Sequence, residues 1–175
     1  DAWQRYGQSG HGNWDIIYPG YKYNMTDVQA SLGLHQLKKI DRFWKTRRKI
    51  VDMYDKALKD IPCVLTLRRG LDKNSKDAFH LYNIIIQTEK IKADRDQILR
   101  AMQAENIGLG VHYRAIHLQS YYKKRFGFRR GDYPNAEYAS ERVLSLPLYP
   151  SMKRKDVYDV IACVRKVITA YEKSE

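Results

Sequence analysis

The chain has 175 residues, of which 43% are hydrophobic and 30% are charged, and its formal net charge is +12. This balance is typical of a folded domain and excludes the composition of a disordered chain. No apolar run in the sequence approaches the roughly 20 residues that span a bilayer. The two cysteines match neither a disulfide framework nor a metal-ligand spacing. We therefore expect a globular protein of the cytoplasm, without a metal or a membrane partner.

The first 60 residues predict an irregular arm and a long helix. Residues 1–25 are rich in Gly, Tyr and Trp and show no sustained period, which indicates an arm laid over a surface. Thr26 and Gln29 then have the spacing of a capping box, in which each side chain bonds to the backbone N–H of the other residue. Apolar residues recur from there at helical intervals to about Leu58, so we expect one long helix, bent near Asp41.

The next part of the sequence alternates strands with helices. β-branched residues predict short strands at 63–67 and 79–87. An Asp-x-x-Gln start predicts a helix over 94–105, and a Gly-x-Gly turn leads from it into a third expected strand at 111–113. This alternation favours an α/β layer in which helices cover one face of a small sheet.

The last third of the sequence predicts three more helices. Two short ones are expected over 118–126 and 135–144, and two prolines then force extended backbone at 146–150. From 157 to 171, apolar residues follow the i, i+3, i+4, i+7 pattern. That pattern predicts a terminal amphipathic helix with one buried face.

The high positive charge suits an anionic partner, but its distribution favours no particular one. Short basic clusters at 47–49, 123–125 and 129–130 are most simply interpreted as solvated faces. The segment 124–128 superficially resembles the aromatic strand of an RNA-recognition motif. It lacks the glycine before the first aromatic residue and it ends an expected helix. We therefore expect no nucleic-acid partner.

The densest group of chemically capable side chains lies in a single short segment. It contains His112, Tyr113, Arg114 and His117, just after the tight turn that follows Gly108. Loops at such positions commonly carry functional groups. From the residues alone, the two histidines are interpretable as ligands, proton shuttles or ordinary hydrogen-bonded histidines. The sequence has no Gly-rich phosphate loop, no nucleophile elbow and no paired Cys-x-x-Cys motif, so no complete catalytic constellation is visible.

A second candidate is the polar segment 19–27, which comes just before the expected start of the long helix. A helix amino terminus favours anions such as phosphate, because its first N–H groups are unpaired and the helix dipole is positive there. The alternative is a plain helix entry in which Asn24 caps or turns the chain. The residues alone leave both interpretations open.

Three segments taken together resemble the DegT/StrS-type sugar aminotransferases, a branch of the fold-type-I pyridoxal-phosphate enzymes. They are 20–27 (GYKYNMTD), 108–119 followed by 121–122 (GLGVHYRAIHLQ and YY), and 145–150 (SLPLYP). Their order and intervals are similar to those of the family, and the resemblance extends over essentially the whole chain. The second segment is most similar to the branch that aminates a UDP-4-keto-pentose for 4-amino-arabinose synthesis.

The resemblance implies a fold and a domain organisation. The fold would be α/β, the C-terminal small domain of an aspartate aminotransferase-like enzyme, with a small sheet covered by helices. Residues 1–25 would belong to the large-domain and dimer interface, residues 26–60 would form an interdomain helix, and residues 61–175 would form the small domain. The whole protein would be a homodimer.

The resemblance also implies a chemistry. The whole enzyme would use pyridoxal phosphate to transfer an amino group, with glutamate as donor, to a keto sugar carried on a nucleotide diphosphate, in polysaccharide or amino-sugar biosynthesis. Asn24 matches the residue that contacts the cofactor phosphate across the dimer interface. His112, Tyr113 and His117 match positions near the sugar nucleotide, whose diphosphate would suit the lysine and arginine clusters. The lysine that holds the cofactor is expected upstream of this chain, so no catalytic residue is assigned within it.

Two hypotheses of different classes follow from this resemblance. In the first, the chain is the C-terminal part of an aminotransferase and is inactive by itself. In the second, it is a non-catalytic binding or assembly module that keeps the same fold. The intact mass of the source protein separates them, because a chain about twice as long indicates the enzyme.

Overall fold

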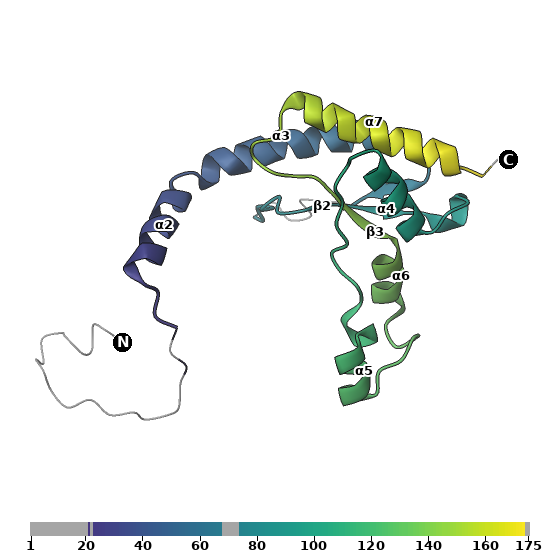
Figure 1. Cartoon of the computed structure of the whole chain (residues 1–175), viewed down its shortest axis with the longest axis horizontal. Coiled ribbons are helices and arrows are strands. Elements are labelled where there is room, and N and C mark those ends of the chain that lie inside the picture. Colours follow the sequence, from purple (N-terminus) through teal and green to yellow (C-terminus); the bar gives the residue numbers. More distant parts are fainter. Residues whose placement is uncertain (1–20, 22, 68–73, 174–175) are drawn as a thin grey trace, which may run out of the picture. The chain divides into compact units, whose positions relative to one another are not determined.

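The computed structural model describes residues 21, 23–67 and 74–173 (Figure 1). These residues belong to two compact units, Asp1–Lys38 and Lys39–Glu175. Most of the predicted arm therefore lies outside the described residues, and the predicted domain boundaries stay a prediction. No described helix is long and apolar enough to cross a membrane.

In the first unit, helix α2 spans Asp27–Leu37 and begins as the sequence predicts. The Thr26 hydroxyl accepts a hydrogen bond from the Gln29 N–H at 3.3 Å, and the Gln29 side-chain oxygen accepts one from the Thr26 N–H at 3.0 Å. These two bonds complete the predicted capping box. The helix buries none of its side chains, and Val28 is 71% exposed. Within its own unit, the apolar side of α2 thus lacks cover from the described residues.

Helix α3 spans Ile40–Leu58, so the prediction of one continuous helix is wrong. Helix α2 ends after Leu37, and two lysines separate it from α3. Lys39 has φ −101°, which departs from the helical value, and its side chain makes no capping hydrogen bond. The interruption falls just before Asp41, the position where the apolar pattern predicts a bend.

The second unit is built on a three-stranded antiparallel sheet in the order β1-β2-β3. Strand β1 spans Val64–Thr66, β2 spans Tyr82–Ile86 and β3 spans Val143–Leu146. The register pairs the first residue of β1 with the last of β2, and the first residue of β2 with the last of β3. The two strands predicted in the middle of the sequence are therefore confirmed.

The third strand of this sheet differs from the predicted one. Residues 111–113 do not form a strand, and Gly110 makes an isolated bridge to Ser145 through two backbone hydrogen bonds of 2.8 and 3.2 Å. The first two residues of strand β3, Val143 and Leu144, were expected at the end of a helix over 135–144. Helix α6 ends just before Val143, whose backbone is extended and whose side chain is buried in the sheet. Burial in the sheet overrides the local helical pattern here.

Helices α3, α4 (Arg95–Ala104) and α7 (Arg154–Tyr171) lie on one face of the sheet (Figure 1). The predicted Asp-x-x-Gln capping box of α4 is present. The predicted stripe of the terminal helix is also buried: Val157, Val160, Ile161, Val164, Val167 and Ile168. Alternate residues of β2 face these helices, namely Tyr82, Ile84 and Ile86. We call the three helices and this sheet face the core layer.

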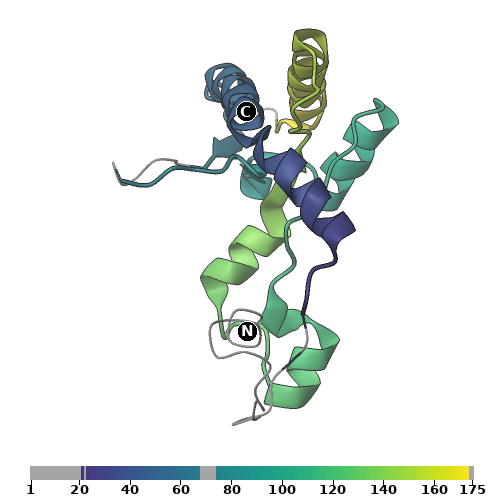
Figure 2. The ribbon, with the colours of Figure 1, turned by 90° about the vertical axis from the view of Figure 1, so that its left-hand side faces the viewer.

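The opposite face of the sheet is covered by residues 110–142, which we call the cavity segment. It contains a short 3-10 helix at Ile116–Leu118, then α5 (Ser120–Phe126) and α6 (Pro134–Arg142). Gly127 ends α5 with φ +72°, a left-handed conformation that glycine adopts at little cost. Figures 1 and 2 show α5 and α6 extending from the sheet on the side away from α7.

Candidate functional site

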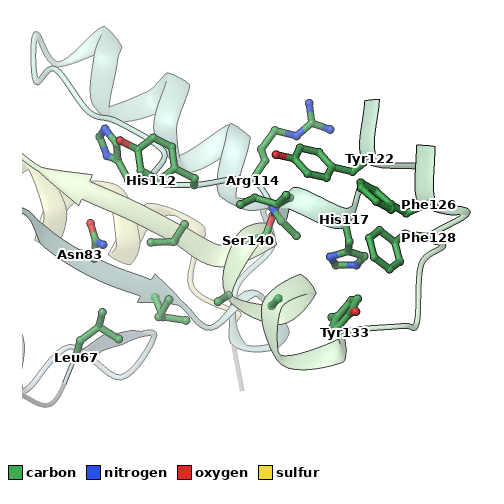
Figure 3. Close-up of a pocket in the computed structure, with 17 residues that line it drawn as sticks. Leu67, Asn83, His112, Arg114, His117, Tyr122, Phe126, Phe128, Tyr133 and Ser140 are labelled. Carbon is green, nitrogen blue, oxygen red and sulfur yellow. The ribbon is translucent and has the colours of Figure 1, made fainter. Parts of the chain in front are cut away.

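A cavity of about 720 Å³ lies between the sheet and the cavity segment (Figure 3). Successive side chains of a strand point to opposite faces of the sheet. Asn83 and Ile85 of β2 and Val143 of β3 therefore form the floor of the cavity, whereas their neighbours along each strand face the core layer. His112 lies at one end of the cavity and His117 at the other (Figure 3). The structure therefore brings the two predicted histidines to one cavity, together with Tyr113.

His112 is held by a chain of polar side chains from two strands. Its Nδ1 lies 2.7 Å from the Ser145 hydroxyl oxygen, and that hydroxyl donates to the Asn83 side-chain oxygen at 2.6 Å. Ser145 is only 4% exposed. A buried hydroxyl paired on both sides fixes the orientation of the ring it contacts, because either bond would be costly to lose.

Gly110 makes room for this orientation. A Cβ atom at Gly110 would clash with His112 Cε1 and lie 3.0 Å from Nδ1, closer than real Cβ atoms normally come. The two backbone hydrogen bonds between Gly110 and Ser145 bring the ring beside the serine hydroxyl. The Gly-x-Gly turn seen in the sequence thus has a steric role at its second glycine.

Tyr113 and Arg114 supply the exposed polar groups of the cavity. Tyr113 is 71% exposed, and its ring meets the His112 ring edge to face at 4.7 Å between centroids. In the described part of the chain, neither the Tyr113 hydroxyl nor the Arg114 guanidinium has a hydrogen-bond partner. Both side chains line the cavity and are therefore available to a ligand.

His117 is tied into the protein more tightly than His112. It is 6% exposed, and its Nε2 lies 2.9 Å from a carboxylate oxygen of Glu137 on α6. The same oxygen accepts the backbone N–H of Gly131 at 2.8 Å. The hydrogen bond from His117, supported by that of Gly131, holds the pKa of Glu137 below its usual value although burial acts in the opposite direction. Because an ionised carboxylate only accepts, His117 must carry a proton on Nε2.

Further bonds fasten the cavity segment to its surroundings. The Ser140 hydroxyl accepts the backbone N–H of Ala115 at 2.8 Å. Arg95 of α4 reaches the carbonyl oxygens of Ser140 and Val143 at 3.3 and 3.1 Å. The rings of the α5 end pack on one another around His117, which contacts Tyr133 at 4.9 Å between ring centroids. The 112–117 stretch therefore has a defined position without being part of the sheet.

Asn24 lies in the other unit, two residues before the N-cap of α2. It is exposed, and no other described residue bonds to its amide. The cap of α2 is completed by Thr26 and Gln29, so Asn24 is not needed for it. Thr26, rather than Asn24, is therefore the N-cap residue of α2, and the contact of Asn24 with a cofactor phosphate stays a prediction.

Several residues of the site were not singled out from the sequence. Asn83, Glu137 and Ser140 lie in a strand and a helix that gave only structural signals. Ser145 lies in one of the family-like segments, and its position in a buried run before Pro147 is the one signal that marks it.

Cys63 and Cys163 are both buried and are not joined in a disulfide. Among the described residues no cluster of His, Cys, Asp and Glu is arranged to hold a metal ion.

Comparison with known proteins places the chain in one family. The sequence profile of the DegT/DnrJ/EryC1/StrS aminotransferase family matches residues 1–165. The uncharacterized protein MJ1066 of Methanocaldococcus jannaschii is 41% identical over 169 residues, which cover 97% of this chain and 43% of that protein. The spore coat polysaccharide biosynthesis protein SpsC of Bacillus subtilis is 42% identical over 168 residues, which cover 95% of this chain and 43% of that protein. The chain thus spans less than half the length of these relatives.

Solved structures agree with the sequence comparison. The putative sugar aminotransferase Spr1654 from Streptococcus pneumoniae, in its PMP-form, matches with a TM-score of 0.82 and 30% identity over 93% of this chain and 40% of that one. PseC from Helicobacter pylori, an aminotransferase involved in the biosynthesis of pseudoaminic acid, matches with a TM-score of 0.79 and 25% identity over 90% and 41%. Spr1654 has also been solved in a PLP-form. The predicted family, the fold-type-I fold class and pyridoxal phosphate as its cofactor are confirmed.

Proposed function

Because the chain belongs to the DegT/DnrJ/EryC1/StrS aminotransferase family, we propose that the full-length protein is a pyridoxal-phosphate-dependent sugar aminotransferase. It transfers an amino group from glutamate to a keto sugar carried on a nucleotide diphosphate, in polysaccharide or amino-sugar biosynthesis. The observation that carries this proposal is the cavity in which His112, Tyr113 and Arg114 present polar groups beside the sheet. The names of SpsC and PseC support a biosynthetic role of this kind.

The residues present fit a cofactor that is held mainly from outside this chain. When bound, pyridoxal phosphate supplies the electron sink that amino-group transfer requires. None of the described residues that line the cavity is a lysine, which agrees with a cofactor-holding lysine outside residues 1–175. The amide of Asn24, which bonds to no other described residue, fits a phosphate oxygen, and in a homodimer it would contact the cofactor of the partner subunit.

The two ends of the cavity have different roles in binding the sugar nucleotide. At one end, His112 and Tyr113 orient the sugar through single hydrogen bonds, and Arg114 provides a cation for the diphosphate. At the other end, His117 lines the wall while its Nε2 is bonded to Glu137. His117 thus supports the shape of the site through the cavity segment and offers a ring face to the ligand.

The first experiment tests the reaction and the source of the lysine. Full-length protein is loaded with pyridoxal phosphate and mixed with L-glutamate, and conversion of the cofactor to its amino form is followed by absorbance. In a separate sample without glutamate, the cofactor-bound lysine is reduced with borohydride and identified by mass spectrometry. We expect conversion, with the label outside residues 1–175. Absence of conversion, or a single labelled lysine within these residues, would contradict the proposal and favour a non-catalytic binding module.

The second experiment tests the substrate residues. With glutamate and a UDP-4-keto-pentose as substrates, His112→Ala should raise the KM for the sugar nucleotide and leave the KM for glutamate nearly unchanged. His80, which is exposed and outside the cavity, provides the matched control in His80→Ala. Equal increases in both constants would show that His112 acts only on the structure.

A further inference from the structure

The two cavity histidines differ in which nitrogen the protein engages. His117 uses Nε2 for its bond to Glu137, whereas His112 uses Nδ1 for its bond to Ser145. A neutral imidazole carries one proton, so the engaged nitrogen and its partner decide whether the other nitrogen donates or accepts. For His117, the bond to the Glu137 carboxylate places the ring proton on Nε2. For His112 the direction of the hydrogen bonds from Ser145 to Asn83 must be established.

The distances along this chain of hydrogen bonds indicate its direction. The 2.6 Å between the Ser145 and Asn83 side-chain oxygens is typical of an O–H···O bond and short for an N–H···O bond. The serine proton therefore points to Asn83. Since a hydroxyl has only one proton, Ser145 must accept from His112, and the 2.7 Å bond is Nδ1–H···O.

One ring nitrogen of His112 then remains for a ligand. Its Nε2 has no hydrogen-bond partner in the described part of the chain, and the ring lines the cavity. With the proton on Nδ1, a neutral ring has its lone pair on Nε2. The two residues that fix the ring, Ser145 and Asn83, are both uncharged and come from adjacent strands, which hold them rigidly.

We propose that Ser145 and Asn83 are positioning residues that hold His112 in its Nδ1-protonated tautomer, so that Nε2 accepts a hydrogen bond from a hydroxyl of the sugar substrate. The substrate part of this statement rests on the proposed function. The tautomer does not, because it follows from contacts within this chain. An acceptor at Nε2 selects a ligand group that donates, such as a sugar hydroxyl, over a bare phosphate oxygen.

Histidine tautomers are measured directly by long-range ¹H–¹⁵N correlation spectra of full-length protein labelled with ¹⁵N-histidine, at about pH 8, where ordinary histidines are neutral. The His112 signals are assigned by their loss in His112→Gln. We expect pyrrole-type Nδ1 and pyridine-type Nε2 for His112, and the reverse for His117, which serves as the internal reference. A His112 protonated on Nε2 in the wild type would overturn the proposal without any need for a variant.

Variants then test which residues hold the tautomer. Ser145→Ala should move His112 toward the other tautomer and leave the His117 signals in place. Asn83→Asp, which keeps an acceptor for the serine proton, should preserve the wild-type pattern. The matched control is Ser140→Ala, since Ser140 is also buried in the cavity wall but bonds to Ala115. An unchanged His112 in Ser145→Ala, or an equal change in Ser140→Ala, would contradict the positioning role.

Kinetics separate failure of this proposal from failure of the proposed function. In Ser145→Ala, the KM for the UDP-4-keto-pentose should rise roughly five- to tenfold, the effect of about one hydrogen bond. The rate of the glutamate half-reaction should stay close to that of the wild type. A protein that shows the expected tautomers but no transamination would refute the function and leave the positioning of His112 intact. Transamination with an unchanged KM would refute the hydroxyl contact alone.

Discussion

The core layer and the cavity segment lie on opposite faces of one three-stranded sheet and are held in different ways. In the core layer, the sheet face and helices α3, α4 and α7 share a continuous set of buried apolar side chains. The cavity segment is positioned by individual polar bonds, among them those of Ser145, His117 and Ser140, together with the rings packed around His117. Apolar contacts are numerous and tolerant, whereas each polar bond depends on two particular groups. We therefore expect the fold and the site to respond to different mutations.

The largest expected effect is in the core layer. Ile84 lies on the helix-facing side of β2 with no exposed surface, so Ile84→Ala removes buried methyl groups and leaves a cavity. Its free energy of unfolding should fall by about 2–5 kcal/mol, measured by urea denaturation. Leu65 on β1 is 44% exposed and provides the control, because Leu65→Ala should cost about 1 kcal/mol or less. Equal losses would mean that the apolar core layer does not dominate the stability.

A smaller and local effect is expected in the cavity segment. His117→Ala leaves the carboxylate of Glu137 without its side-chain donor, which is unfavourable for a buried group. Amide hydrogen exchange should accelerate in residues 115–133, whose position depends on this bond, and stay unchanged in β2. The exposed His80 again gives the control variant, His80→Ala. Faster exchange throughout the sheet would show that the two regions unfold together.

The pH dependence of stability tests the same bond in another way. The pKa of Glu137 is held below its ordinary value of 4.5, with the hydrogen bond from His117 as the main cause. A carboxyl with a lowered pKa in the folded state stabilises the protein above that ordinary value, and this contribution disappears as the pH falls through the folded-state pKa. The difference in melting temperature between wild type and Glu137→Gln should therefore shrink on acidification from about pH 6 to pH 3. A constant difference would exclude this linkage.

The sequence predicted the core layer well because its signals are periodic. The apolar stripe of the terminal helix and the capping box at Asp94 recur in the structure. Such patterns depend on residues close together in the chain, so neighbouring letters are enough to find them. The errors arose where contacts with residues distant in the sequence determine the secondary structure. Val143 and Leu144 continue a helical pattern locally, but pairing with β2 makes them a strand.

The site was predicted only in part for the same reason. His112, Tyr113 and His117 were recognised because they cluster in the sequence and resemble a family motif. Glu137 lies 20 residues from His117, and Ser145 lies 33 residues from His112. Asn83 lies 62 residues from Ser145. A hydrogen bond between side chains so far apart leaves no periodic signal. The tautomers of the two histidines, which distinguish their roles, therefore become visible only in the structure.

A hydrogen bond from Tyr54 joins the core layer to the extended segment after β3. Tyr54 of α3 is fully buried, and its hydroxyl donates to the Pro147 carbonyl oxygen at 2.9 Å. Burial raises the pKa of Tyr54, so the hydroxyl remains a donor in the neutral range. Tyr54→Phe removes this one bond and keeps the ring, and should lower the free energy of unfolding by about 0.5–1.5 kcal/mol. Tyr158→Phe, at a half-exposed position, should change it less; a larger loss there would contradict this view.

Alkylation of the two cysteines tests whether the core layer opens as one cooperative unit, and it is the smallest perturbation. Cys63, just before β1, is 1% exposed and Cys163 of α7 is 6% exposed, and burial raises the pKa of both thiols. Iodoacetamide reacts with the thiolate, so each thiol must reach water before it is alkylated. If the core layer opens cooperatively, the two cysteines should be alkylated at the same slow rate, measured by mass spectrometry of their peptides.

A thiol in the cavity segment provides the reference for this measurement. Ser120 is exposed at the start of α5, so a Ser120→Cys variant should be alkylated at nearly the rate of a free thiol. Cooperative opening also requires that Ile84→Ala accelerate Cys63 and Cys163 by the same factor, because both report one equilibrium. His117→Ala should leave both rates unchanged, since it loosens only the cavity segment. Acceleration of one core cysteine alone would show that β1 and α7 open separately and that the core layer is not a single cooperative unit.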